Sequence, residues 1–182
     1  MTGRPGPQRH VALVGLSGTG KSTVAPLLAR ALGSIAADVD RIVERRCGAA
    51  VAEVFAERGE AGFREVESEV LAEVLAGPDA VVATGGGAVL AAANRDLLRR
   101  TATVVWLRTE LDVLVERMER TAEERPLLSG DPGTTLRRLA AEREPLYTEV
   151  ADLVVDATAL HPQQVADLIE RDLRAGGDDE PR

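Results

Sequence analysis

The chain has 182 residues, of which 45% are hydrophobic and 29% are charged, and its formal net charge is −8. This length suffices for one domain with a sizeable core, and the composition is that of an ordinary soluble protein. The excess of negative charge argues against a nucleic-acid-binding surface, so an anionic substrate would need a local cluster of arginines. No apolar stretch approaches the ~18 residues of a membrane span, and we expect no membrane partner.

The sequence carries one cysteine, Cys47, which excludes an intrachain disulfide and is consistent with a reducing cytoplasm. We interpret Cys47 as a small residue that packs within a helix, the alternative being a reactive thiol. Residues 1–9 lack the apolar core of a signal peptide. We predict disordered tails at residues 1–9 and 175–182 around a single domain at residues 10–174, and a cytoplasmic location.

Short apolar strands and helical patterns alternate along the chain. Strands are predicted at residues 11–15, 35–38, 80–84, 103–107 and 153–155, and helical stretches at residues 24–32, 60–76, 94–100, 111–120 and 165–173. Buried strands separated by helices imply parallel pairing, and hence an α/β fold in which a five-stranded parallel sheet lies between two layers of helices. Ligands of such sheets bind beyond the carboxyl ends of the strands. Residues 121–133 (TAEERPLLSGDPG) form an irregular loop of a length that is typical of functional loops.

The stretch GLSGTGKST at residues 15–23 follows the first strand and opens the first helix. Its glycines Gly15, Gly18 and Gly20 allow a tight turn whose backbone N–H groups point into one concavity, where the helix N-terminus adds positive charge. In the pattern G-x-x-x-x-G-K-[ST], the lysine reaches the β- and γ-phosphates of a nucleotide and the next hydroxyl binds Mg²⁺. We predict a nucleotide site that comprises Gly18, Thr19, Gly20, Lys21, Ser22 and Thr23.

Two further motifs follow the second and third predicted strands. Asp38 and Asp40 are two positions apart, so on an extended chain both carboxylates point into one cleft; the alternative is a helix N-cap with a solvated neighbour. Gly85, Gly86 and Gly87 allow a ligand to approach the backbone closely, unless they form only a flexible turn. The third strand, AVVAT, has no aspartate for Mg²⁺ and the chain has no N-K-x-D sequence, and both absences disfavour a GTPase.

Three arginines lie in distinctive segments: Arg64 in GEAGFREVE, Arg125 in RPLL and Arg143 in REPLY. Taken alone, each would be interpreted as a solvated surface charge. Together with GLSGTGKST, the D-x-D pair and the glycine triplet, these segments occur in the order and at about the spacing of the shikimate kinases. The chain therefore resembles that family from residue 10 to about residue 160. The resemblance implies a P-loop kinase with a nucleoside-monophosphate-kinase-like fold and a mobile lid at residues 121–133.

The resemblance also implies roles for the phosphate-transfer residues. Asp38, with Ser22, would help to hold Mg²⁺, and Asp40 would bind a ring hydroxyl of shikimate and serve as the candidate general base. Lys21 and Arg125, the latter on the lid, would supply positive charge around the moving phosphoryl group. Closure of the lid would exclude water, which otherwise competes as the phosphate acceptor.

For the acceptor, the resemblance implies a clamp around the shikimate carboxylate. Arg64 and Arg143 would bind this carboxylate, a task that suits the planar and bidentate guanidinium group. Gly86 would offer its backbone N–H to the substrate, with Gly85 and Gly87 beside it in the substrate site. A gluconate kinase also needs a carboxylate clamp, but the FR, GGG and RPLL set is not the pattern of that relative.

Two features of the sequence concern the adenine side of the nucleotide. The family usually has an arginine seven residues before the RPLL arginine; this chain has Met118 there and Arg117 one residue earlier. The residue that flanks the adenine is therefore left open. Pro162 is a candidate to pack on the adenine, because the segment ALHP lacks the basic residue that some relatives place beside the nucleotide.

We expect a monomer that uses ATP and Mg²⁺ to phosphorylate the 3-hydroxyl of shikimate, giving shikimate 3-phosphate and ADP on the route to chorismate and the aromatic amino acids. One alternative is a kinase for a related cyclitol or for aminoshikimate, because the same motifs would serve it. A second is a P-loop regulatory protein that has lost catalysis. The intact Lys21, Asp40 and Arg125 argue against the second alternative.

Overall fold

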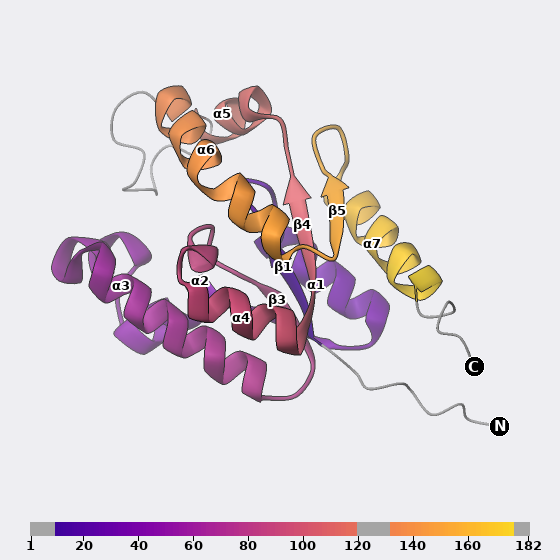
Figure 1. The fold of residues 1–182 in the computed structure, drawn as a ribbon, viewed down its shortest axis with the longest axis horizontal. Helices are drawn as coiled ribbons and strands as arrows, with labels where there is room; N and C mark the ends of the chain where they lie inside the picture. The colour runs from indigo at the N-terminus through magenta and orange to yellow at the C-terminus, as the bar shows by residue number, and fades with distance from the viewer. Residues whose placement is uncertain (1–9, 120–131, 177–182) are drawn as a thin grey trace.

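The computed structural model describes residues 10–119 and 132–176 (Figure 1). Five strands form one sheet in the order β2-β3-β1-β4-β5, and every neighbouring pair is parallel. The strands are β1 (His10–Val14), β2 (Ile35–Asp38), β3 (Ala80–Ala83), β4 (Ala102–Arg108) and β5 (Leu153–Asp156). The predicted five-stranded parallel sheet is therefore confirmed, and each predicted strand boundary lies within one residue of the observed one.

Helices cover both faces of this sheet, as predicted (Figure 1). They are α1 (Lys21–Leu32), α2 (Val39–Cys47), α3 (Val51–Ala76), the 3₁₀ turn η1 (Ala88–Leu90), α4 (Ala92–Thr101), α5 (Leu111–Glu119), α6 (Pro132–Val150) and α7 (Pro162–Gly176). α1 and α7 pack on one face, and α2 to α6 pack on the other. None of the helices in the two described ranges is both long and apolar enough to cross a membrane.

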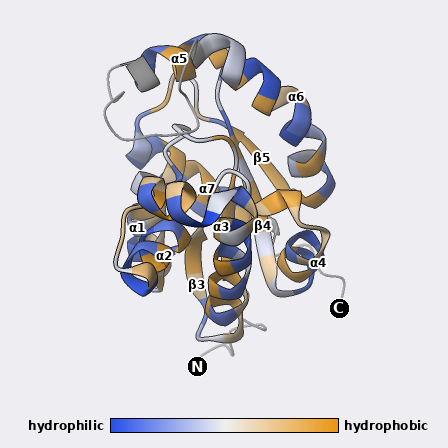
Figure 2. Cartoon of the chain, turned by 90° about the vertical axis from the view of Figure 1, so that its left-hand side faces the viewer, coloured by the Kyte–Doolittle hydropathy of each residue, from blue (hydrophilic) through white to orange (hydrophobic). Residues whose placement is uncertain are grey.

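The alternation of side chains along the strands explains why both faces of the sheet are apolar. On β1, Val11 and Leu13 contribute to the core beneath α1 and α7, whereas Ala12 and Val14 contribute to the core beneath the other helices. Because the strands are covered on both sides, they are hydrophobic at consecutive positions (Figure 2). Cys47 is partly buried against the core beneath α2 to α6, as a helix-packing residue would be.

Glycines end or interrupt helices at positions where the predicted helical stretches stop or begin. Gly33 ends α1 with a φ of 65°, in the left-handed region. Gly59, with a φ of 69°, interrupts α3, so the helix predicted at residues 60–76 is its second part. The first part, and α2 before it, were not among the helical stretches named from the sequence.

The ends of the domain and the predicted lid are described only in part. Helix α7 continues to Gly176, two residues into the segment predicted as a C-terminal tail. Pro132 and Gly133, the last two residues of the predicted lid, begin α6. The rest of the predicted lid, residues 121–131, and the predicted tails at residues 1–9 and 177–182 lie outside the described residues.

The turn after β1 requires a glycine. Gly15 has a φ of 137°, and a Cβ at this position would overlap the carbonyl oxygen of Leu107 in β4. We expect Gly15→Ala to lower the free energy of unfolding by about 2–4 kcal/mol, since backbone strain and overpacking add. The matched control is Gly33→Ala, where φ is also positive but no atom lies within 4 Å of the added Cβ, so only about 1–2 kcal/mol should be lost. Urea denaturation measures both values, and equal losses would contradict the packing argument.

Candidate active site

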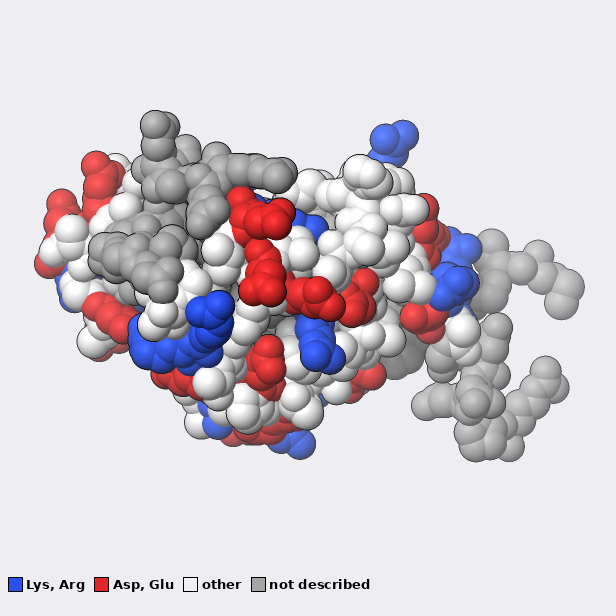
Figure 3. Space-filling model, turned by 90° about the horizontal axis from the view of Figure 1, so that it is seen from above, with Lys and Arg blue, Asp and Glu red and all other residues white. Residues whose placement is uncertain are grey.

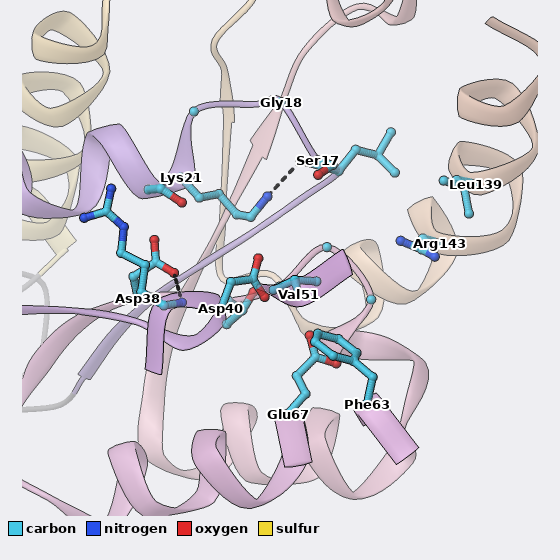
Figure 4. Close-up of a pocket in the computed structure, with 18 of the residues that line it drawn as sticks. Ser17, Gly18, Lys21, Asp38, Asp40, Val51, Phe63, Glu67, Leu139 and Arg143 are labelled. Carbon is cyan, nitrogen blue, oxygen red and sulfur yellow. Dashed lines mark hydrogen bonds between the residues drawn. The ribbon is translucent and has the colours of Figure 1, made fainter. Parts of the chain in front are cut away.

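A cleft of ≈ 510 Å³ opens beyond the carboxyl ends of the strands. The volume lies in the range of small-molecule sites. The glycine-rich turn after β1, the start of α2, helix α3, the turn after β3 and helix α6 all contribute to its walls. Seen from above, this end of the molecule carries interspersed acidic and basic side chains (Figure 3). Figure 4 shows Lys21, Asp38 and Asp40 on one side of the cleft, Arg143 on another, and Glu67 and Phe63 reaching it from α3.

The turn between β1 and α1 has the geometry of a phosphate cradle. Gly18 and Gly20 have positive φ values of 86° and 95°, which bend the backbone tightly ahead of the α1 N-terminus. Lys21 is buried, and its Nζ donates hydrogen bonds of 2.7 Å to the carbonyl oxygens of Gly15 and Leu16. The amine therefore lies over the loop, where it also contributes positive charge beside the cleft.

The hydroxyl groups of this turn differ in their surroundings. Thr19 is buried and its Oγ1 donates to the carbonyl oxygen of Leu16 at 2.9 Å, so this hydroxyl stabilises the loop itself. Ser22 and Thr23 are exposed and line the cleft. Ser22 is thus accessible to a metal ion bound with a nucleotide.

The aspartate pair corrects one sequence-based expectation. Asp38 and Asp40 do not lie on an extended chain, because Asp38 is the last residue of β2 and the N-cap of α2. Its Oδ1 accepts a hydrogen bond of 3.2 Å from the backbone N–H of Arg41, which starts the helix at once and places Asp40 in the first turn. Both carboxylates nevertheless line the cleft. Asp38 is an N-cap, as the alternative interpretation had it, but Asp40 is not a solvated neighbour.

Asp40 is held in an unusual electrostatic environment. Its Oδ1 is buried and has no hydrogen-bond partner among the described residues. Burial raises the pKa of Asp40 above its ordinary value, while the positive charge of Lys21 acts in the opposite direction. A carboxylate with a raised pKa and an unpaired oxygen is suited to accept a proton from a bound hydroxyl.

Arg64 is fixed by two carboxylates, those of Glu67 and, at 3.5 Å from its Nη2, Glu60, and by two aromatic rings. Its Nη1 donates a hydrogen bond of 2.6 Å to Oε2 of Glu67, one turn later on α3. The guanidinium group also lies over the rings of Phe55 and Phe63, 5.7 Å and 5.1 Å from their centroids. Its Nε is buried and has no acceptor in the described part of the chain. These contacts fix the guanidinium group at the wall of the cleft.

The three glycines after β3 allow the charged side chains to come close to the backbone. A Cβ on Gly85 would overlap Oε1 of Glu67 and lie 2.9 Å from Oδ1 of Asp40. A Cβ on Gly87 would overlap the guanidinium group of Arg64. The triplet is consequently required by packing, and it is more than the flexible turn that the sequence left open.

Arg143 enters the cleft from a different direction, on α6. It is only 5% exposed, and its Nε has no hydrogen-bond partner among residues 10–119 and 132–176. Arg64, which is partly buried, and Arg143, which is buried, thus present two incompletely paired guanidinium groups to one cleft. Such groups attract a planar anion.

The remaining sequence-predicted residues concern the nucleotide. Arg125 and the side chain of Met118 lie outside the described residues. Arg117 lines the cleft, and its Nη2 donates a hydrogen bond of 3.3 Å to the carbonyl oxygen of Thr158, after β5. Pro162 is the exposed first residue of α7 and does not line the cleft in the described structure. The candidates for the adenine site therefore stay predictions.

Sequence reasoning missed two kinds of residue in the site. Glu67 lies within the quoted motif GEAGFREVE, but it was assigned no role, although its spacing of three from Arg64 on a helix indicates a contact. Phe55 and Phe63 stack on each other with centroids 4.3 Å apart. No sequence pattern singles out Phe55, because it reaches Phe63 only across the bend at Gly59.

The family model described as shikimate kinase matches residues 17–174. A shikimate kinase of Symbiobacterium thermophilum is 46% identical over 165 residues, covering 89% of this chain and 95% of that protein. One of Pseudomonas putida is 43% identical over 90% of this chain and 95% of its own length. The structure of an Acinetobacter baumannii shikimate kinase in complex with shikimate has a TM-score of 0.89 at 36% identity, covering 93% of this chain and 95% of that chain.

The buried pair of Arg64 and Glu67 predicts a pH-dependent loss of stability. Burial raises the pKa of Glu67, and the charge and hydrogen bond of Arg64 oppose the rise. A carboxyl group whose pKa is raised in the folded protein favours folding at low pH, and this contribution is lost as pH rises through that pKa. We expect Arg64→Ala to lower the free energy of unfolding by about 3 kcal/mol at neutral pH, because Glu67 is left buried and unpaired.

This deficit should shrink as the pH is lowered, since protonation removes the unpaired charge. Urea unfolding of the variant and the parent between about pH 5 and about pH 8 measures the difference. Adding Glu67→Gln to Arg64→Ala should abolish the pH dependence of the deficit. Arg46→Ala, which breaks an exposed pair with Glu73, serves as the surface control and should cost much less. A deficit independent of pH would contradict the assignment to Glu67.

Proposed function

The chain belongs to the shikimate kinase family, and from this premise we propose that it transfers the γ-phosphoryl group of ATP to the 3-hydroxyl of shikimate. The products are ADP and shikimate 3-phosphate. The observation that carries the assignment of the acceptor is that Arg64 and Arg143 both line one cleft and that each guanidinium group retains a buried Nε without a partner among the described residues. A carboxylate is the group that such a pair binds best.

The acceptor is oriented by its carboxylate at one end and by its hydroxyls at the other. Arg64 and Arg143 hold the carboxylate, and the backbone N–H of Gly86 provides a further short donor between them. Asp40 then meets the reacting hydroxyl, because it lies beside Gly85 on the opposite side of the triplet from Arg64. In this arrangement Asp40 orients the 3-hydroxyl and accepts its proton as the oxygen attacks the γ-phosphorus.

The donor nucleotide is positioned by the turn at residues 15–23. Backbone N–H groups of the turn and the α1 N-terminus bind the phosphates, and the amine of Lys21 moves from the loop carbonyls to the β- and γ-phosphate oxygens. Ser22 and Asp38 both line the cleft and are the residues that would hold Mg²⁺, which when bound neutralises charge on the phosphates. Arg125 is proposed as an additional cation from the lid.

We also propose that the reaction takes place in the cytoplasm and that the enzyme works as a monomer. The rival acceptors are aminoshikimate, which retains the carboxylate that Arg64 and Arg143 would hold, and a related cyclitol. An ADP-release assay that compares shikimate with aminoshikimate, quinate and gluconate tests the choice, and a higher kcat/KM for any of the other three compounds would overturn it.

The two aspartates should be separable by their responses to Mg²⁺. We expect Asp40→Asn to lower kcat by roughly 10²–10⁴-fold, the usual contribution of general acid–base catalysis. Asp38→Asn should instead raise the Mg²⁺ concentration needed for half-maximal rate. Since burial raises the pKa of Asp40, the acidic limb of the parent's pH–rate profile should lie above the ordinary carboxylate range. Superimposable Mg²⁺ titrations of the two variants would argue against this division of roles.

The carboxylate clamp can be tested on α6, where a matched control is available. We expect Arg143→Ala to weaken shikimate binding by roughly tenfold to a hundredfold, since a charge-assisted hydrogen bond contributes about 1.5–3 kcal/mol. The affinity for ATP, measured without shikimate, should hardly change. Arg138→Ala removes a 69%-exposed arginine from the same helix and should leave both affinities near the parent values.

A substrate without a carboxylate completes this test. The alcohol that corresponds to shikimate, with CH₂OH in place of the carboxylate, should be a poor substrate of the parent enzyme. It should lose little further activity in Arg143→Ala, because the arginine has no anion to bind. An alcohol that is phosphorylated as well as shikimate would refute the clamp and leave the kinase assignment standing.

A further inference from the structure

Tyr147 connects the turn after β3 with helix α6. Its ring is 1% exposed, and its hydroxyl donates a hydrogen bond of 2.6 Å to the carbonyl oxygen of Gly86. The ring also packs against Trp106 of β4, with centroids 5.7 Å apart. Tyr147 is the only tyrosine and Trp106 the only tryptophan of the chain. A short, partly buried hydrogen bond at the wall of the cleft is thus made by a residue to which the proposed reaction assigns no role.

The same hydroxyl is also linked to Arg143. Arg143 and Tyr147 are four residues apart on α6, so their side chains lie on one face of the helix. Burial raises the pKa of Tyr147, while the charge of Arg143 and a hydrogen bond from it act in the opposite direction. The phenol therefore stays protonated and donates to Gly86, and the guanidinium group of Arg143 lies near enough to act on the same hydroxyl.

The hydrogen bond to Gly86 also fixes the peptide unit that follows. In a trans peptide the carbonyl oxygen and the next N–H point in opposite directions, so the N–H of Gly87 points away from Tyr147. Gly86 and Gly87 both line the cleft, and neither N–H donates to another described residue. On its other side, Gly87 abuts the guanidinium group of Arg64. One peptide unit thus lies between the two arginines, and Tyr147 determines its orientation.

We infer that Tyr147 is a positioning residue for the acceptor: its hydroxyl aligns the Arg143 guanidinium and the Gly86–Gly87 peptide so that both donate to one substrate carboxylate. This role rests on the proposed function and deepens it. The phenol itself contacts protein groups only, so it acts through Arg143 and Gly86. Because its ring packs on Trp106 of β4, the phenol also holds these groups in a fixed position relative to the sheet.

Tyr147→Phe isolates the hydroxyl while the ring and its packing remain. We expect the Kd for shikimate, measured by calorimetry, to rise about tenfold, because this is the size of effect that the loss of one partly buried hydrogen bond produces. The Kd for a non-hydrolysable ATP analogue and kcat at saturating shikimate should stay within about twofold of the parent. Thr148→Val is the control, because it removes the neighbouring exposed hydroxyl, which donates to the carbonyl oxygen of Glu144; it should change neither affinity.

The outcomes distinguish this inference from the proposed function. A parent enzyme that does not phosphorylate shikimate would overturn both. If the parent does so, a folded Tyr147→Phe that binds shikimate normally overturns this inference alone. Equal weakening of shikimate and the ATP analogue would also overturn it, since it would show a general structural role. In an Arg143→Ala background, the added cost of Tyr147→Phe should be smaller than in the parent, because the two residues act together.

A measurement without any substitution decides the matter if Tyr147→Phe does not fold. Because Tyr147 is the only tyrosine, protein grown with 3-fluorotyrosine has a single fluorine-labelled site. We expect its ¹⁹F resonance to shift on titration with shikimate and to stay in place with the ATP analogue alone. A resonance that does not move at saturating shikimate would show that the phenol is not coupled to the carboxylate site, and the inference would fail.

Discussion

The parallel pairing of β3 with β1 on one side and β2 on the other is the constraint on which the cleft depends. Leu13 on β1 and Asp38 on β2 both lie level with Ala83 on β3, so the three strands end at the same edge of the sheet. Two residues further along each chain stand Gly15, Asp40 and Gly85. Register alone therefore brings together the phosphate-binding turn, a buried carboxylate and the glycine triplet. These groups are far apart in sequence, yet their relative positions are set by backbone hydrogen bonds.

Close packing at this edge determines the balance of charge inside the cleft. The glycine triplet leaves room for Glu67 and Arg64 to lie directly against the backbone. Glu67 pairs with Arg64, and the other charged lining residues are the basic Lys21, Arg41, Arg117 and Arg143 and the acidic Asp38, Asp40 and Glu44. The cleft can thus accept anions although the chain as a whole carries a net charge of −8. Burial makes these local charges more effective than the distant surface carboxylates, which water and salt screen.

The parts of this arrangement that local sequence controls were predictable. The strands, the phosphate-binding turn and the C-cap at Gly33 each follow from patterns of a few consecutive residues. The extended geometry expected for Asp38 and Asp40 was wrong because the Asp38 side chain caps α2, so that the helix begins directly after the strand and contains Asp40.

Contacts between distant segments were not predictable in the same way. The role of Tyr147 depends on Gly86, which lies 61 positions away, and on the packing of α6 over the turn after β3. A single sequence contains no periodicity that records such a contact. Glu67 is an intermediate case: its contact with Arg64 follows from helical spacing, but its complete burial depends on the absence of a side chain at Gly85.

In the proposed reaction the acceptor site and the nucleotide site share one wall of backbone, and this arrangement bears on how phosphoryl transfer is guided. Gly86 abuts the phosphate-binding turn, because a Cβ on it would lie 3.2 Å from the backbone nitrogen of Ser17. The peptide that faces the acceptor is therefore in contact with the loop that faces the nucleotide. Phosphoryl transfer depends mainly on positioning and on neutralised charge. A site whose two halves touch through backbone atoms at the edge of a buried sheet keeps the donor and acceptor oxygens aligned without relying on long side chains. In the proposed function, the arginines then serve to select the acceptor by its charge.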